Sequence, residues 1–135
     1  MTAVTVTADK ARFLRLALTA DSVVTGGNGL LYLVLAGPAG DLLGAEAGLL
    51  RGIGAFLLGY GVAVGLLAAR RDPGTPGPRI VIAMNIAWTL GSVAAVVTGA
   101  LGLTTVGAIW AIAQALAVAA FAELQIMGLR KARAN

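Results

Sequence analysis

The chain has 135 residues, of which 59% are hydrophobic and only 12% are charged. An average soluble domain carries about 25% charged residues, so the composition excludes an ordinary water-soluble protein. The chain contains no cysteine and no histidine. Their absence excludes disulfides, thiol redox chemistry, cysteine-ligated iron–sulfur clusters and the usual histidine-based zinc, haem and acid–base sites. We therefore expect no metal and no cofactor.

Four long apolar stretches fill most of the sequence, at about residues 13–36, 47–69, 80–102 and 105–128. About 20 apolar residues in a helix cross a hydrocarbon core about 30 Å thick, and backbone polar groups in lipid must be satisfied within each segment. We predict an all-α, polytopic membrane protein. Residues 1–135 would form one domain, a bundle of four transmembrane helices built as two helical hairpins.

The first stretch carries a polar stripe. Asp21, Thr25 and Asn28 are spaced i, i+4 and i+7, which places them on one face of a helix. These polar residues and the length of the stretch argue against a cleaved signal peptide, so we expect a retained span. The glycines around Asn28 are interpreted as a packing notch, where a neighbouring helix can approach closely. The alternative is a point where the helix unwinds. Residues 37–40, Gly-Pro-Ala-Gly, are predicted to end this helix, with Asp41 as a possible N-cap of a short lead into the next one.

The second stretch is rich in glycine. Gly54, Gly61 and Gly65 share one stripe, and the last two form a GxxxG pattern typical of close helix contact, either internal or between subunits. Arg51 lies near the expected outer end, where it is interpreted as an anchor that reaches the interface. Its alternative role is to pair with Glu46 or with an anionic group of a ligand.

The loop at residues 70–79 contains three prolines and two glycines, which forbid a helix there and separate the two hairpins. The third stretch then repeats the stripe of the first, with Asn85, Thr89 and Ser92 at an offset of 64 from its polar residues. The two stripes should face each other, away from lipid. This short match leaves a true internal duplication open.

The fourth stretch follows a tight turn in which Thr104 or Thr105 can cap the helix. Gln114 shares a face with Gln125, whereas Glu123 lies about 180° from Gln114. One of these two faces should therefore meet another subunit, or Glu123 leans toward Arg130. We expect a homo-oligomer, with a dimer favoured.

Nine of the ten basic residues lie in three clusters, at residues 10–15, 70–79 and 130–133. Four spans place all three clusters on one side, so the positive-inside rule predicts a multi-pass protein of the cell inner membrane with both termini cytoplasmic. The clusters are expected to touch anionic lipids of the bilayer. No nucleic acid is expected as a partner, despite a sequence pI of about 10.4.

The depth of the polar residues suggests a site. At 1.5 Å per residue, Asp21, Asn85 and Glu123 fall at one level on the cytoplasmic side of the middle. The candidate ligand or proton site comprises Asp21, Thr25, Asn28, Asn85, Thr89, Gln114 and Glu123. It would be a cavity or proton path opening from the cytoplasm, with Asp21 as the ionisable group. The competing explanation is structural, because Ser, Thr and Asn often only lock membrane helices together.

Three segments of the sequence resemble small four-helix integral membrane proteins that are widespread in actinobacteria. They are residues 21–33 (DSVVTGGNGLLYL), 84–88 (MNIAW, with Trp88) and 114–125 (QALAVAAFAELQ). The resemblance implies the four-helix topology and no activity, because that group has no assigned function. The chain also has the size of the small multidrug resistance transporters, but it lacks their membrane glutamate, for which Asp21 would have to substitute.

Two functional hypotheses remain. The chain either binds or transports a small molecule or a proton through an intramembrane polar site, or it is an accessory or structural protein whose polar residues only pack helices. An enzyme is not expected, because no phosphate-binding loop, no pair of catalytic carboxylates in a polar cleft and no Ser/His or Cys/His arrangement is present.

Overall fold

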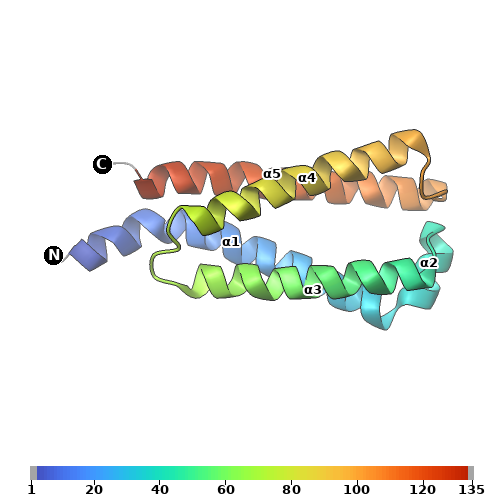
Figure 1. Ribbon diagram of the computed structural model, residues 1–135, viewed down its shortest axis with the longest axis horizontal. Coiled ribbons are helices and arrows are strands. Elements are labelled where there is room, and N and C mark those ends of the chain that lie inside the picture. The colour runs from blue at the N-terminus through green and yellow to red at the C-terminus, as the bar shows by residue number, and fades with distance from the viewer. Residues whose placement is uncertain (1–2, 134–135) are drawn as a thin grey trace.

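The computed structural model describes the backbone of residues 3–133 and the side chains of residues 10–133. In this range the chain forms five α-helices and no strand, which confirms the all-α prediction. The helices are α1 (Ala3–Val34), α2 (Ala36–Leu43), α3 (Ala47–Ala69), α4 (Pro76–Thr98) and α5 (Thr105–Arg133) (Figure 1). Helices α3, α4 and α5 are each long and apolar enough to cross a membrane, and α1 with α2 adds a fourth span if the bent pair counts as one.

The helix boundaries agree with the sequence prediction in part. Helix α3 covers the predicted range, and α5 begins as predicted but continues to Arg133. Helix α4 begins and ends four residues earlier than expected. It starts at Pro76 because proline suits the first turn, where its missing N–H has no helical partner. It stops at Gly99, which takes the left-handed conformation (φ 69°) that a C-cap glycine adopts readily.

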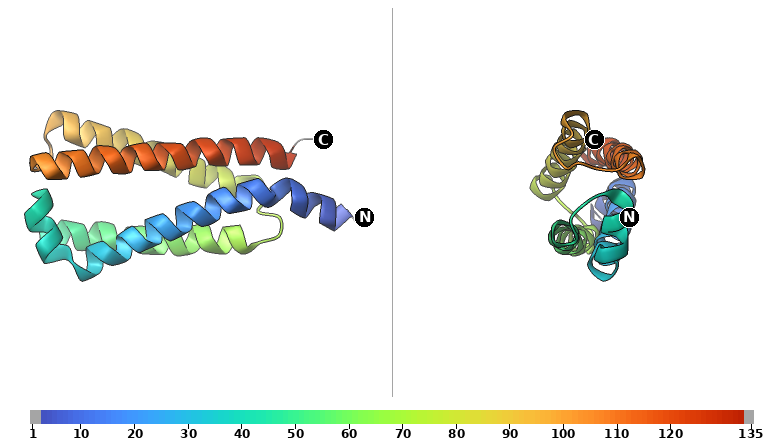
Figure 2. Two further views of the ribbon diagram at one scale, coloured as in Figure 1. Left: turned by 180° about the vertical axis from the view of Figure 1, so that it is seen from behind. Right: turned by 90° about the vertical axis from the view of Figure 1, so that its right-hand side faces the viewer.

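The prediction that residues 37–40 end the first helix is wrong, because these residues belong to helix α2. Helix α1 ends at Val34 and the chain then bends by 98° into α2. Pro38 is tolerated because it lies in the first turn of α2. Helix α2 consequently lies across one end of the molecule instead of continuing α1, as Figures 1 and 2 show.

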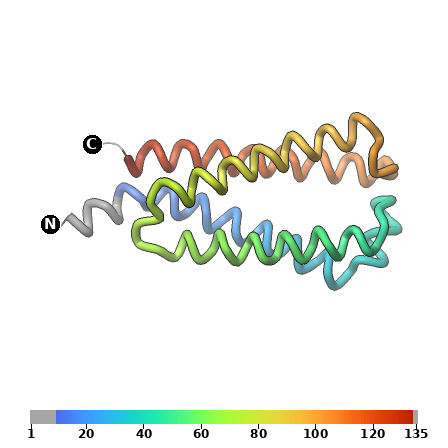
Figure 3. Tube along the Cα trace, in the orientation of Figure 1, coloured from blue at the N-terminus to red at the C-terminus, as the bar shows by residue number. Residues whose placement is uncertain are grey.

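The long helices pack as two pairs that separate along their length. Helix α1 packs along α3, α4 packs along α5, and α1 also contacts α5, whereas α3 and α4 touch at few points. Both termini and the α3–α4 connection lie at one end, which we call the basic end because all three basic clusters lie there (Figures 1 and 3). Helix α2 and the α4–α5 turn lie at the opposite end, which we call the far end (Figure 2).

Glycines bring the backbones of α1 and α3 into close contact. A Cβ atom added to Gly61 would lie 2.7 Å from the Cα of Gly26, and one added to Gly54 would lie 2.7 Å from the carbonyl oxygen of Gly29. Gly65 faces the hydroxyl of Ser22, which donates a 2.7 Å hydrogen bond to the Gly61 carbonyl. Helix α1 is continuous through its glycines. The contact is therefore internal to the chain, and the glycines of α1 form a packing notch.

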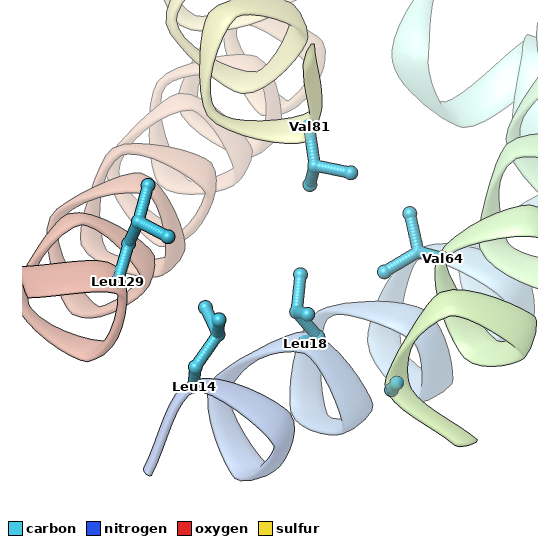
Figure 4. Close-up of a cluster of buried hydrophobic side chains, with 6 residues drawn as sticks. Leu14, Leu18, Val64, Val81 and Leu129 are labelled. Carbon is cyan, nitrogen blue, oxygen red and sulfur yellow. The ribbon is translucent and has the colours of Figure 1, made fainter. Parts of the chain in front are cut away.

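A buried apolar core closes the bundle at the basic end. Four helices contribute to it: α1, α3, α4 and α5. Its members are Leu14, Leu18, Val64, Ala68, Val81 and Leu129 (Figure 4). Gly128 lets α5 approach the backbone of α1 at this level, since a Cβ there would lie 2.7 Å from the Cα of Leu14. The two helix pairs are thus joined firmly at this end.

At the far end, one threonine ties the α4–α5 turn to α2. The Thr104 N–H donates to the Leu43 carbonyl at 3.0 Å, and its hydroxyl donates to the Leu42 carbonyl at 2.8 Å. The same hydroxyl accepts a 3.0 Å hydrogen bond from the N–H of Gly107, so Thr104 is the residue that caps α5. These bonds join the two helix pairs a second time.

We expect Thr104→Ala to lower the free energy of unfolding by about 1 kcal/mol, the usual cost of a lost N-cap. The substitution removes both side-chain bonds, whereas the backbone bond to Leu43 remains. Thr105→Ala is the matched control, because no side-chain hydrogen bond of Thr105 is found among the side chains that the structure describes. Thermal unfolding in detergent should separate the two variants, and equal melting temperatures would contradict the assignment.

Candidate functional site

Three polar side chains from three helices meet in the interior. Asp21 of α1 is 1% exposed, Asn85 of α4 is 5% exposed and Gln125 of α5 is fully buried. One carboxylate oxygen of Asp21, Oδ2, accepts hydrogen bonds from Asn85 Nδ2 at 2.8 Å and from Gln125 Nε2 at 2.7 Å. We call these three residues the polar cluster. It links both helix pairs next to the apolar core, on the side toward the far end.

The carboxylate fixes the orientation of both amides. A carboxylate oxygen can only accept, so Asn85 and Gln125 must turn their NH₂ groups toward Asp21. Asn85 Nδ2 also donates to Gln125 Oε1 at 3.0 Å. The side-chain oxygen of Asn85, Oδ1, accepts a 3.2 Å hydrogen bond from the Tyr60 hydroxyl. That hydroxyl also lies 3.2 Å from the Val81 carbonyl. The cluster therefore presents an acceptor, not a donor, toward α3.

Neutral groups satisfy the second oxygen of Asp21 as well. Oδ1 accepts a 2.7 Å hydrogen bond from the hydroxyl of Thr25, one turn further along α1. No buried side-chain nitrogen or oxygen in the described part of the chain lacks a hydrogen-bond partner. An acidic group in a membrane span is costly unless it is shielded and hydrogen-bonded. Here all three donors to Asp21 are uncharged.

One of the three residues predicted to lie together at one depth in the membrane does not lie with the others. Glu123 does not join Asp21 and Asn85, because its side chain is exposed on the outer face of α5. Gln125, two residues further on and on the opposite face, takes that place. The helical pattern contained the signal, since Gln125 shares a face with Gln114. Choosing that face consistently would have selected Gln125 and rejected Glu123.

A second set of polar contacts joins α1 to α5 further toward the far end. Asn28 Nδ2 donates to Gln114 Oε1 at 3.1 Å, and Trp110 Nε1 donates to the Tyr32 hydroxyl at 2.7 Å. Thr89 does not face Thr25 in a matched pair. Its hydroxyl lies 2.9 Å from the Asn85 carbonyl one turn earlier and 3.4 Å from the Ala115 carbonyl.

A cavity of about 160 Å³ lies between the two helix pairs, on the far side of the polar cluster. Most of its walls are apolar, and none of its lining residues is charged. Its polar lining consists of Thr25, Asn28, Tyr32, Tyr60, Asn85, Ser92 and Gln114. Asp21 is not exposed to the cavity, because Thr25 and Asn85 stand in front of it. The cavity therefore offers amide and hydroxyl groups in an uncharged, mainly apolar space.

The cavity is closed toward the basic end and accessible at its sides. The polar cluster and the apolar core lie beneath it, and Leu43 and Gly107, which meet where α2 packs on α5, line its other end. Lining residues on its flanks are accessible from outside, such as Phe56 of α3 (47% exposed) and Val24 of α1 (46% exposed). The sequence predicts an opening from the basic end, where the leucine, valine and alanine side chains of the apolar core pack together in this structure.

Aromatic side chains stand between α3 and α4 on one flank. The Phe56 ring stacks on the Trp88 ring with centroids 6.0 Å apart and planes 11° apart. Phe56 also contacts Tyr60 at 5.9 Å between centroids. This stack bridges the two helices where their backbones have separated, so it narrows that side of the cavity.

The remaining candidate residues lie outside the cavity. Arg51 is exposed on α3 and does not line it. Gly54, Gly61 and Gly65 lie in the α1–α3 contact described above. Sequence reasoning gave no site role to Tyr60, Tyr32 or Trp110, although each hydrogen-bonds within the site. The only indication in the sequence was that these aromatic residues lie at a depth close to that of the polar side chains. Their positions on the helix faces do not show which side chains they contact.

Comparison of the chain with family models, with curated proteins and with solved structures found no match in any of the three.

Proposed function

We propose that this protein binds a small, uncharged, mainly apolar molecule within the membrane, in the cavity between its two helix pairs. The observation that carries the proposal is the lining, in which amide and hydroxyl groups occur without any charged side chain. Apolar cavities with a few placed polar groups are the usual form of small-molecule sites. The proposal places the protein in the cell inner membrane with both termini cytoplasmic, as the basic clusters indicate.

The polar lining keeps hydrogen-bonding capacity for a ligand. Gln114 uses its side-chain oxygen to accept from Asn28, while no hydrogen bond donated by the NH₂ group of Gln114 is found within residues 10–133. The Tyr32 oxygen accepts from Trp110, so its own hydrogen can be donated. Both side chains line the cavity. They suit a ligand with a hydroxyl or carbonyl group on an apolar body.

The route into the cavity supports the same class of ligand. The polar cluster and the apolar core close it toward the basic end, and lining residues such as Phe56 and Val24 are accessible on flanks that face lipid in a membrane. A molecule entering there must first dissolve in the bilayer, which disfavours ions because of their solvation cost. A sealed basic end also favours binding over passage from one side to the other.

We expect 1-naphthol to bind the protein in lipid nanodiscs and Gln114→Leu to weaken that binding about five- to tenfold, the effect of one lost hydrogen bond. Naphthalene, which lacks the hydroxyl, should bind more weakly than 1-naphthol and should not respond to Gln114→Leu. The negatively charged 1-naphthoate should not bind. Equilibrium dialysis against empty nanodiscs measures all three and corrects for partitioning into lipid.

The three probes separate binding in the cavity from adsorption to the protein surface. If naphthalene loses as much affinity as 1-naphthol in Gln114→Leu, the amide does not contact the hydroxyl. If 1-naphthoate binds as well as 1-naphthol, the cavity is not selective for uncharged molecules and the proposal fails.

A structural role is the second candidate, and the polar cluster supports it. All its buried polar atoms are satisfied by the protein itself, which is what a clamp between helices requires. In that case the protein would bind none of the probes, and substitutions in the cluster would change only its stability.

A further inference from the structure

A groove on the outer face of the α4–α5 pair is separate from the cavity. At the basic end it is lined by three arginines, Arg79 from the first turns of α4 and Arg130 and Arg133 from the last turn of α5. All three side chains are exposed. The wall between them is apolar, and the groove has a volume of about 620 Å³. We propose that this groove binds one anionic phospholipid, with its phosphate on the arginines and an acyl chain between α4 and α5.

The apolar wall continues toward the middle of the molecule. Ile86, Ile126 and Arg130 also line an adjoining hollow that extends along the same two helices to Leu90 and Ala119. An acyl chain attached to a phosphate at the arginines would follow this direction, from the interface into the hydrocarbon core. Soluble phosphate would leave this part of the groove empty, so its length favours a lipid.

The positive charges that could bind an anion lie at only one end of the groove. A guanidinium group binds phosphate oxygens in a bidentate manner, and three arginines line this end of the groove. The acidic residue Glu123 lines the adjoining hollow and not the groove itself, two turns before Arg130 and about 10 Å away along the helix axis. The other basic residue of the last turn, Lys131, is directed elsewhere, since its Nζ lies 4.7 Å from the centroid of the Phe13 ring on α1.

Native mass spectrometry of the purified full chain, titrated with phosphatidylglycerol or with phosphatidylcholine of the same acyl chains, tests the proposal. Wild type should retain one phosphatidylglycerol in preference to phosphatidylcholine. Arg130→Gln should weaken retention about fivefold, and the triple variant Arg79→Gln/Arg130→Gln/Arg133→Gln by more. Ile86→Trp, which fills the apolar part, should weaken it as well.

The matched control is the triple variant Arg12→Gln/Arg70→Gln/Arg71→Gln. It removes the same charge from the same end, but these exposed residues lie outside the groove. Retention should stay within about twofold of wild type. Equal losses in both triple variants would show bulk surface charge instead of a site. Normal retention by Ile86→Trp, or competition by glycerol phosphate as strong as that of the intact lipid, would also overturn the proposal. Circular dichroism verifies that each variant is folded.

Discussion

Replacing Asp21 with leucine is expected to lower the free energy of unfolding by about 2–4 kcal/mol. The substitution leaves Gln125 Nε2 without an acceptor and leaves Asn85 Nδ2 with Gln125 Oε1 alone, and each buried donor left without a partner costs about 1–3 kcal/mol. Leucine has the same number and branching of side-chain heavy atoms, and its larger methyl groups add some overpacking to this loss. Denaturant or thermal unfolding in detergent micelles measures the effect.

Asp21→Asn is the control that separates hydrogen bonding from charge. Its amide oxygen can accept from both neighbours as the carboxylate does, and its NH₂ group can donate to the Thr25 hydroxyl, which also accepts. We expect a loss below about 1 kcal/mol. If Asp21→Asn and Asp21→Leu are equally destabilised, the orientation of the amides around Asp21 is wrong. If Asp21→Asn folds normally but loses a pH-dependent binding that wild type shows, Asp21 exchanges a proton during binding.

Gly61→Ala is expected to destabilise the protein by about 1–3 kcal/mol, the usual cost of overpacking. Its Cβ would lie 2.7 Å from the Cα and nitrogen of Gly26 and 3.1 Å from the carbonyl oxygen of Ser22. All three are backbone atoms, so a side-chain rotation cannot relieve the clash. Helices α1 and α3 must move apart, which also disturbs the hydrogen bond from Ser22 to Gly61.

Gly59→Ala provides the matched control on the same helix. No atom lies within 4 Å of a Cβ added there, so the substitution should stabilise α3 by about 0.5–1 kcal/mol through its better helix propensity. The two variants thus differ in the sign of their effect on the melting temperature. A stabilised Gly61→Ala would contradict the close contact between α1 and α3.

The sequence predicted the location of the spans better than their ends. Hydropathy alone marked residues 47–69, because both ends of α3 coincide with changes in composition. It missed α2, because Gly37 and Pro38 normally indicate a loop and only the packing of α2 across the far end makes a helix favourable there. The left-handed turn at Gly99 ended α4 early, and no pattern distinguished that glycine from the many others in the chain.

The candidate site was predictable where one helix determined it. The stripe of Asp21, Thr25 and Asn28 follows from helical spacing, and these residues do face the interior of the bundle. The partners of that stripe depend on how far each helix slides along its neighbour, which spacing does not encode. Depth counted from predicted helix ends therefore chose Glu123 over Gln125. The cavity could not be predicted from the sequence either, since it arises where α3 and α4 separate.

The binding of 1-naphthol to wild type and to Ala117→Trp in nanodiscs tests the central claim most directly. Ala117 lines the cavity, and a tryptophan there would fill the space while leaving the polar cluster and the apolar core intact. We predict saturable binding of one 1-naphthol per wild-type chain and no saturable binding to folded Ala117→Trp. Equal binding by the two proteins, or none by wild type, would contradict an intramembrane ligand site between the helix pairs.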